Sequence, residues 1–393
     1  MWDIWSHIAK YIKKDKDKCR LMMTCKEISK NKFYFNEQIL VKKIYNSRWF
    51  DNFVKIFVSL LPHEKKILKI PSSLIYLTYC LFDNTELPDK NLFPSSFTNL
   101  SYIILCANVA VPTKDSIPSS ITSLTFSNEQ NHSIKNCIPS SITHLTLGYN
   151  FNRSIKNCIP SSVTHLTFGY NFNQPINDRI PNSVTSECVN TFKRYRSYLP
   201  ESITHLTFGV RFNKPINNGI LDSVTSGCVN TSKRYRYCLP GSITHLTFGY
   251  YFNQPIKDAI PSKVIHLEFG WKFNQPIKDE IPSSVTHLIF GSNFNQSINW
   301  IPSSVSHLIL GYYFNQPINN YVSSVTHLTL HGCHNDDINS DWYFNRPPEN
   351  YIPSCVKNIC LCGSQKFQNK FRETDHIREF IDRYNIIVQF PYY

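Results

Sequence analysis

Residues 159–176 read Ile-Pro-Ser-Ser-Val-Thr-His-Leu-Thr-Phe-Gly-Tyr-Asn-Phe-Asn-Gln-Pro-Ile, and close variants of this stretch recur through most of the chain. A fixed period of about 20 residues is typical of solenoids, in which each unit is too short to bury its apolar side chains alone. The sequence therefore predicts an elongated stack of repeats in place of two or three globular domains. The clearest copies begin at Ile117, Ile138, Ile159, Leu239, Ile260, Ile281 and Ile301.

The apolar spacing within one unit indicates how it folds. Val163, Leu166 and Phe168 follow the pattern of leucine-rich repeats. Alternate residues of a strand face opposite sides, so Leu166 and Phe168 should point into the core while His165 and Thr167 point outward. Prolines on the return side of the unit disfavour helix. We predict a leucine-rich-repeat-like solenoid with a parallel β-sheet, one strand for each repeat of about 21 residues, and little helix in the array.

The residues after the strand predict a turn. Gly169 ends the strand, Phe172 should fill the corner of the unit, and Asn173 should bond to turn backbone. The same asparagine follows phenylalanine at 152, 213, 253, 274, 295, 315 and 345. We interpret these amides as a structural ladder that joins successive repeats, in preference to a ligand site.

The core Phe-Asn-x-Pro-Ile, followed by Ile-Pro-Ser-Ser-Val-Thr-His-Leu, resembles the FNIP repeat over roughly residues 70–360. This family is a relative of the leucine-rich repeat and is abundant in social amoebae and in giant viruses of amoebae. The resemblance implies an interaction domain in which the repeat carries no catalytic role.

Histidine recurs at one outward strand position, which makes that row a candidate target-binding surface. Adjacent strands lie roughly 5 Å apart, so neighbouring imidazoles that carry charge would repel one another and should titrate below their ordinary pKa. The alternative interpretation is a regular His-Thr surface with no role beyond stacking. The row comprises His144, His165, His205, His245, His266, His287, His307 and His327.

Two units, separated by one regular unit, depart from the pattern, because Glu187 and Gly227 stand where the inward leucine belongs. We expect these to be the weakest layers of the stack, since a carboxylate would be buried there. Each unit ends in Lys-Arg-Tyr-Arg, and two layers of sheet would place the clusters about 10 Å apart. Such clusters suit acidic partners or nucleic acid, although a short basic run is more often a solvated edge. Their basic residues are Lys193, Arg194, Arg196, Lys233, Arg234 and Arg236.

The thirteen cysteines and the net charge of +13 place limits on function. The cysteines follow the repeat and no secretory signal precedes them, so we expect reduced thiols in a soluble, cytoplasmic protein, or one in the host cytoplasm if the protein is viral. Soft ligands for zinc cluster at His331, Cys333, His334, Cys360 and Cys362, but this cluster contains no Cys-x-x-Cys pair. Pairs of histidines in the histidine row are a second candidate for metal binding, but no carboxylates lie near them in the sequence to orient their rings. We therefore expect no metal and no cofactor.

Residues 1–45 carry apolar side chains at helical spacing and do not follow the repeat. This segment resembles an F-box: Asp3 to Ile12 matches the first helix of that family, Asp17 the link, and Met22-Met23-Thr24-Cys25-Lys26 the close of the second helix. The opening Leu-Pro of the family is absent, and Ile28 stands where tryptophan is common. The resemblance implies contact with a cullin-ligase adaptor protein, and a plain helical cap is the alternative. The adaptor-binding candidates are Ile4, Ile8, Ile12, Leu21 and Cys25.

These boundaries divide the chain into an F-box-like segment (1–45), a linker and N-terminal cap (46–69), a repeat solenoid (70–362) and a C-terminal cap (363–393). The cap should contain a helix near 375–383 followed by a strand near 386–390. No serine–histidine–aspartate set, glycine-rich phosphate loop or carboxylate pair stands out, so we expect no enzyme activity.

The resemblances together imply a substrate-recognition subunit of an SCF-type ubiquitin ligase, with an adaptor on the N-terminal segment and an unidentified protein target on the solenoid. A scaffold without adaptor binding and a nucleic-acid or acidic-partner binder are the competing interpretations. A membrane partner is not expected.

Overall fold

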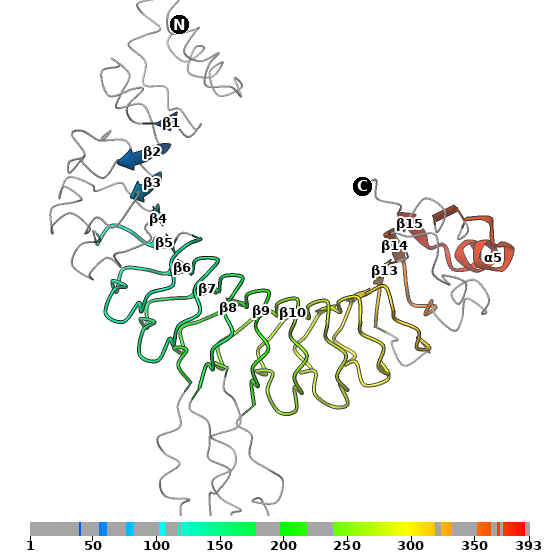
Figure 1. Cartoon of the computed structure of the whole chain (residues 1–393). Coiled ribbons are helices and arrows are strands. Elements are labelled where there is room, and N and C mark those ends of the chain that lie inside the picture. Colours follow the sequence, from blue (N-terminus) through cyan, green and yellow to red (C-terminus); the bar gives the residue numbers. More distant parts are fainter. Residues whose placement is uncertain are drawn as a thin grey trace, which may run out of the picture. The chain divides into compact units, whose positions relative to one another are not determined.

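The structure, a computed structural model, describes residues 39–40, 55–60, 76–81, 102–106, 117, 119–126, 128–177, 197–217, 239–318, 324–331, 352–362, 368–369 and 372–389. The chain forms two compact units, residues 1–153 and residues 154–393. The labels of their strands and of the helix α5 are those of Figure 1.

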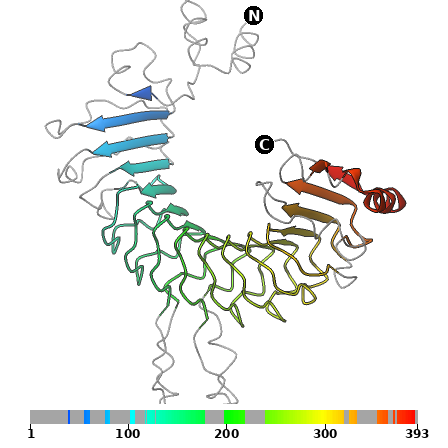
Figure 2. The same cartoon turned by 45° about the vertical axis from the view of Figure 1, so that its right-hand side comes forward.

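The first unit is a parallel sheet whose strands follow one another in sequence order. Leu124 lies opposite Leu145 in the register of its last two strands, and both side chains are buried. Figure 2 shows β2, β3 and β4 side by side and pointing the same way. The strands are β1 (Ile39–Leu40), β2 (Lys55–Leu60), β3 (Tyr76–Leu81), β4 (Tyr102–Cys106), β5 (Ser123–Phe126) and β6 (His144–Thr146).

The second unit continues the same design with strands that match residue for residue. His266 pairs with His287 and Leu267 with Leu288, so that like side chains lie over one another. This register confirms the prediction of one parallel strand for each repeat. The strands are β7 (His165–Thr167), β8 (His205–Thr207), β9 (His245–Thr247), β10 (His266–Glu268), β11 (His287–Ile289), β12 (His307–Leu310), β13 (His327–His331), β14 (Asn358–Cys362) and β15 (Ile387–Gln389).

The core of the second unit consists of apolar rows that run from strand to strand. In the repeat that contains β7, Val163, Leu166, Phe168, Phe172 and Ile176 are all buried. The corner phenylalanines stack at ring-centroid distances of 6.0–6.2 Å along the array. The inward and outward assignment made from the sequence is therefore confirmed, and between residues 117 and 331 the described residues form strands and turns without helix.

The asparagines after the corner phenylalanine form the predicted ladder. The backbone N–H of Asn274 donates to Oδ1 of Asn253 at 2.9 Å, and the backbone N–H of Asn295 donates to Oδ1 of Asn274 at the same distance. Each side chain thus satisfies a turn N–H of the next repeat, which would otherwise lack a protein partner.

The turn between repeats uses a second polar residue: Asp258 and Asp279 adopt positive φ of 53° and 58°, a region that aspartate tolerates better than most residues.

The structure corrects the expectation for the two degenerate units. β7 pairs directly with β8, and β8 pairs directly with β9, so neither unit adds a strand between them. In the sequence, the residues of the two units fall between Ile176 and Leu199 and between Ile216 and Leu239, and 178–196 and 218–238 lie outside the described residues. A layer without its inward leucine would bury a carboxylate or leave a gap, which is a physical reason for β7, β8 and β9 to pair directly with one another. The two units therefore fall, in the sequence, between successive strands of the sheet, and the expectation that each adds a layer there is wrong.

The end of the second unit has a helix and a strand, as the sequence predicts. Helix α5 (Asp375–Tyr384) buries Ile377 and Phe380, and Asn385 ends it in the left-handed conformation. β15 then pairs with β14 as the last strand of the sheet. Among the residues that the structure describes, no helix combines the length and apolar character that crossing a bilayer would need.

Candidate protein-binding surface of the second unit

The histidine row is a stacked column of imidazoles on the outward side of β7 to β13. The ring centroids of His165 and His205 lie 4.1 Å apart, and those of His307 and His327 lie 4.2 Å apart. The two contacts of His266 are longer, at 5.8 Å and 5.9 Å. His144 occupies the equivalent place on β6 of the first unit and is exposed. The predicted outward direction is thus confirmed, while target binding by the row stays a prediction.

A hydroxyl group next to every imidazole of this column except that of His266 contacts the ring. The Oγ1 atom of Thr204 lies 2.9 Å from Nδ1 of His205, and the same contact recurs at most strands of the row. His266 lacks it, because Ile265 precedes it in place of threonine or serine. The missing hydroxyl accounts for the longer ring distances on both sides of His266.

The same hydroxyl also contacts a backbone carbonyl group of the preceding repeat. Thr204 Oγ1 lies 3.3 Å from the carbonyl oxygen of Thr164, and Thr326 Oγ1 lies 3.3 Å from the carbonyl oxygen of Ser306. The hydroxyl has one proton, and both the carbonyl oxygen and Nδ1 lie within its reach, so the tautomer of the histidine decides which of the two accepts that proton. At the end of the row, Nδ2 of Asn358 lies 3.0 Å from Nε2 of His327, and an amide N–H donor requires that nitrogen of His327 to be the acceptor.

Burial and like charges lower the pKa of two histidines. Desolvation lowers the pKa of His266, with smaller effects of His245 and His287 in the same direction, while Glu268 opposes them. Desolvation also lowers the pKa of His307, and His287 and His327 add to it. Glu268 is an outward carboxylate two residues from His266, which corrects our inference from the sequence that no carboxylate lies near the row.

Acidification is expected to destabilise the folded chain through these histidines. Well above the ordinary histidine pKa of about 6.5, both the folded and the unfolded forms hold them neutral, so the full stability is present. As pH falls from there towards the lowered folded pKa, the unfolded chain binds protons first and the free energy of unfolding decreases. Urea denaturation at pH 7.5, 6.5 and 5.5 should show a smaller loss for His307→Gln than for the wild type. The exposed His376 on α5 supplies the control His376→Gln, and equal pH dependence of wild type and H307Q would contradict the assignment.

An aromatic ridge lies beyond the strands, at the two variable positions between glycine and the corner phenylalanine. The rings of Tyr250 and Trp271 stack at 5.6 Å, and Tyr312 meets Tyr313 edge-on at 4.4 Å. Trp271 and Tyr313 are 43% and 47% exposed, which is high for rings of this size. We define the aromatic ridge as Tyr250, Tyr251, Trp271, Tyr312 and Tyr313.

Backbone hydrogen bonds hold the ridge in register. The N–H of Tyr251 donates to the carbonyl of Val210, and that of Lys272 to the carbonyl of Tyr250, at 2.9 Å and 2.8 Å. The sequence interpretation treated these positions only as variable and so missed the ridge. The available signal was the frequency of tyrosine and tryptophan at positions that the repeat does not require for its core.

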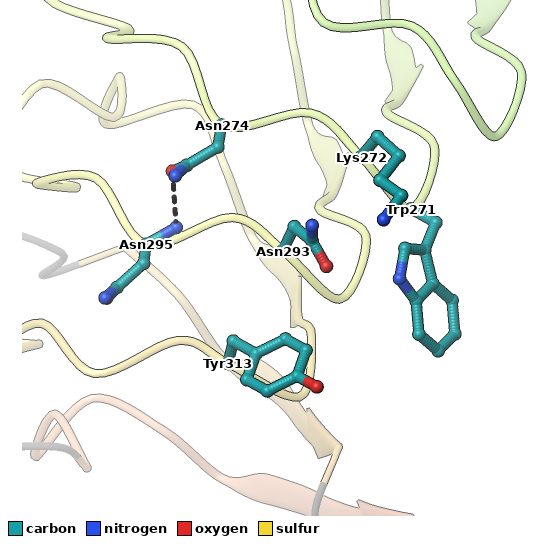
Figure 3. A pocket seen from close by; sticks show the side chains of 6 residues that line it. All are labelled: Trp271, Lys272, Asn274, Asn293, Asn295 and Tyr313. Carbon is teal, nitrogen blue, oxygen red and sulfur yellow. Dashed lines mark hydrogen bonds between the residues drawn. The ribbon is translucent and has the colours of Figure 1, made fainter.

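A shallow pocket of about 430 Å³ interrupts the ridge. Figure 3 shows its lining side chains, with Asn293 central among them. The lining residues are Trp271, Lys272, Asn274, Asn293, Asn295 and Tyr313.

The proposed soft metal ligands are only partly brought together. His331 lies opposite Cys362 in the sheet register, and the sulfur atoms of Cys360 and Cys362 are 3.6 Å apart. Burial raises the pKa of Cys360 to about 11, and the neighbouring Cys362 adds to this, so the thiol form dominates at neutral pH. Cys333 and His334 lie outside the described residues. Within the part of the chain that the structure describes, no group of three or more histidine, cysteine or acidic residues is placed to hold a metal ion.

Two groups of sequence-predicted residues lie outside the described residues. They are the adaptor-binding candidates Ile4, Ile8, Ile12, Leu21 and Cys25, and the basic residues Lys193, Arg194, Arg196, Lys233, Arg234 and Arg236. Their roles stay predictions.

Comparison with known proteins agrees with the repeat geometry. The solved circular leucine-rich-repeat protein CroV588 is 32% identical, with a TM-score of 0.56 over 80% of this chain and 41% of that protein, so the chain spans less than half of its length. No curated protein matches the sequence significantly. The FNIP Repeat pattern matches residues 112–150, 131–157, 151–186, 197–226, 237–272, 273–299 and 297–333, which together make up about half of the chain. The chain therefore belongs to the FNIP repeat family.

Proposed function

We propose that this chain is a protein-binding module whose second unit recognises a target through the histidine row and the aromatic ridge. The observation that carries the proposal is the exposed aromatic ridge, because tyrosine and tryptophan are enriched where proteins bind one another. The regular register of the strands supports it, since a rigid surface loses little conformational entropy on binding. In this proposal the chain catalyses no reaction of its own.

We further propose that residues 1–45 bind a cullin-ligase adaptor and that the chain recruits its target to an SCF-type ubiquitin ligase. The support is the sequence resemblance of this segment to an F-box and its position before the FNIP repeats. A recruiter of this kind acts by raising the concentration of the target near the ligase.

Capture of the purified adaptor by the immobilised full chain tests the ligase role. We expect the wild-type chain to retain the adaptor and the double variant Ile8→Asp/Ile12→Asp to lose it, because charged side chains would disrupt an apolar contact. Lys263→Gln, an exposed change in the solenoid, is the matched control and should bind as the wild type does. Circular dichroism establishes that each variant is folded. Absence of capture by the folded wild type would overturn adaptor binding and leave the binding module without a ligase role.

A further inference from the structure

The pocket in the aromatic ridge exists because one repeat lacks large side chains there. The repeat that contains β11 carries Ser292 and Asn293 at the two variable positions, whereas Trp271 and Tyr313 project from the repeats on either side. The backbone N–H of Asn293 donates to the carbonyl of Trp271 at 2.9 Å, and that of Tyr313 to the carbonyl of Ser292 at 2.8 Å, so the three repeats are held in register. The result is a hollow one repeat wide with an aromatic ring at each end.

The asparagine ladder fixes the orientation of two side-chain amide groups that line the hollow, those of Asn274 and Asn295. Oδ1 of Asn274 accepts the backbone N–H of Asn295 at 2.9 Å and Nε2 of Gln296 at 3.0 Å. Oδ1 of Asn295 likewise accepts the backbone N–H of Asn315 at 2.8 Å and Nε2 of Gln316 at 3.1 Å. A backbone N–H can only donate, so these contacts fix which amide atom is the oxygen. Both oxygens are engaged twice, and the Nδ2 groups are what these two side chains offer to a ligand.

The rest of the lining adds donors and one positive charge. Lys272 supplies an exposed ammonium group, Asn293 a further amide, Trp271 an indole N–H and Tyr313 a hydroxyl. None of the six lining residues carries a carboxylate. A site of this composition favours an anion with several acceptor oxygens, because hydrogen bonds to a charged acceptor are stronger than neutral ones.

We propose that this pocket binds the carboxylate side chain of an aspartate or glutamate in a protein partner, with the rings of Trp271 and Tyr313 packing on either side of that residue. A single lysine matches a carboxylate of charge −1 better than a phosphate monoester of charge about −1.5 to −2. The proposal rests on the protein-binding function proposed above and specifies the chemistry of the partner at one point of the surface.

Side-chain NMR of the isotope-labelled full chain at 0.15 M salt tests the proposal. The probe is a blocked Gly-Glu-Gly peptide, with its glutamine and phosphoserine counterparts as comparison ligands. We expect the glutamate peptide to shift the indole N–H of Trp271 and the amide of Asn293 in a saturable manner, and the glutamine peptide to bind at least about tenfold more weakly.

Two variants and one control locate the binding. Asn293→Asp, which places a carboxylate in the pocket without changing its size, should weaken the glutamate peptide about tenfold or more, and Lys272→Gln about fivefold. Lys263→Gln removes a charge from the repeat that contains β10, outside the pocket lining, and should leave binding unchanged. Backbone spectra show whether each variant keeps the wild-type fold.

Equal binding of the glutamate and glutamine peptides, or unchanged affinity in N293D, would overturn the carboxylate site. Stronger binding of the phosphoserine peptide would overturn it in favour of a phosphorylated partner. These outcomes are independent of the adaptor capture, so failure of the pocket and failure of the ligase role can be told apart.

Discussion

Gly270→Ala is expected to destabilise the second unit by about 3 kcal/mol, which is severe for the addition of one methyl group. A Cβ at Gly270 would lie 2.9 Å from Cα of Tyr250 and still closer to the carbonyl group of Gly249. These neighbours are backbone atoms, which cannot rotate away as a side chain does. The backbones of adjacent repeats would have to separate, and the hydrogen bonds from the N–H of Phe248 to the carbonyl of Glu268 and from the N–H of Lys272 to the carbonyl of Tyr250 would lengthen.

Urea denaturation and hydrogen exchange measure this effect. In a repeat protein, stability is approximately a sum over repeats and their interfaces, so a damaged interface between β9 and β10 should also split one unfolding transition into two. Exchange at the amides of Phe248 and Lys272 should accelerate first. Gly241→Ala is the matched control, because a Cβ there meets only a carboxylate oxygen of Glu201, at 3.9 Å. A G270A chain as stable as G241A would show that the repeats do not approach as closely as described.

Phe273→Ala is expected to cost about 3–5 kcal/mol of unfolding free energy. The ring is completely buried and stacks on Phe269 at 3.9 Å, on Phe252 at 6.1 Å and on Phe294 at 6.1 Å. Its removal leaves a cavity between two repeats and takes away its contacts with the phenylalanines before and after it in the row. The corner cannot collapse readily, because the asparagine ladder fixes the backbone next to it.

Thermal and urea denaturation of three variants separate the effect of lost buried volume from the effect of removing an aromatic ring. Phe273→Leu keeps most of the volume and should lose less than half as much stability as Phe273→Ala. Tyr251→Ala removes a large ring of which 46% is exposed, and it should change the stability by no more than about 1 kcal/mol. Losses of the same size in F273A and Y251A would contradict the assignment of the phenylalanine row as the core.

The repeat pattern alone was sufficient to predict which side chains are inside. Leu166 and Phe168 are buried and His165 lies outward because the strand alternates with period two, and this alternation does not depend on neighbouring units. The asparagine ladder was predictable for a similar reason: a residue that recurs at one place in every unit meets its own copies when the units stack. Helix α5 and β15 followed from apolar spacing near the end of the chain.

Whether the degenerate units contribute strands to the sheet, by contrast, depends on packing between repeats. Their sequence still resembles a repeat, and nothing local distinguishes a weak layer from an insertion. His165 pairs directly with His205 and His205 with His245, so neither degenerate unit contributes a strand between them. The free energy of forming a layer depends on its neighbours, which one unit of sequence does not contain.

The sequence by itself determined the period, the direction of each side chain and the family of this protein. The tertiary structure decided what those side chains do together: how closely the histidine rings stack, why glycine is required after the strand, and where the ridge opens into a pocket. The physical reason is that these properties arise from atoms of adjacent repeats, such as Gly270 against Gly249 and Trp271 against Asn293, which contact only when the repeats stack.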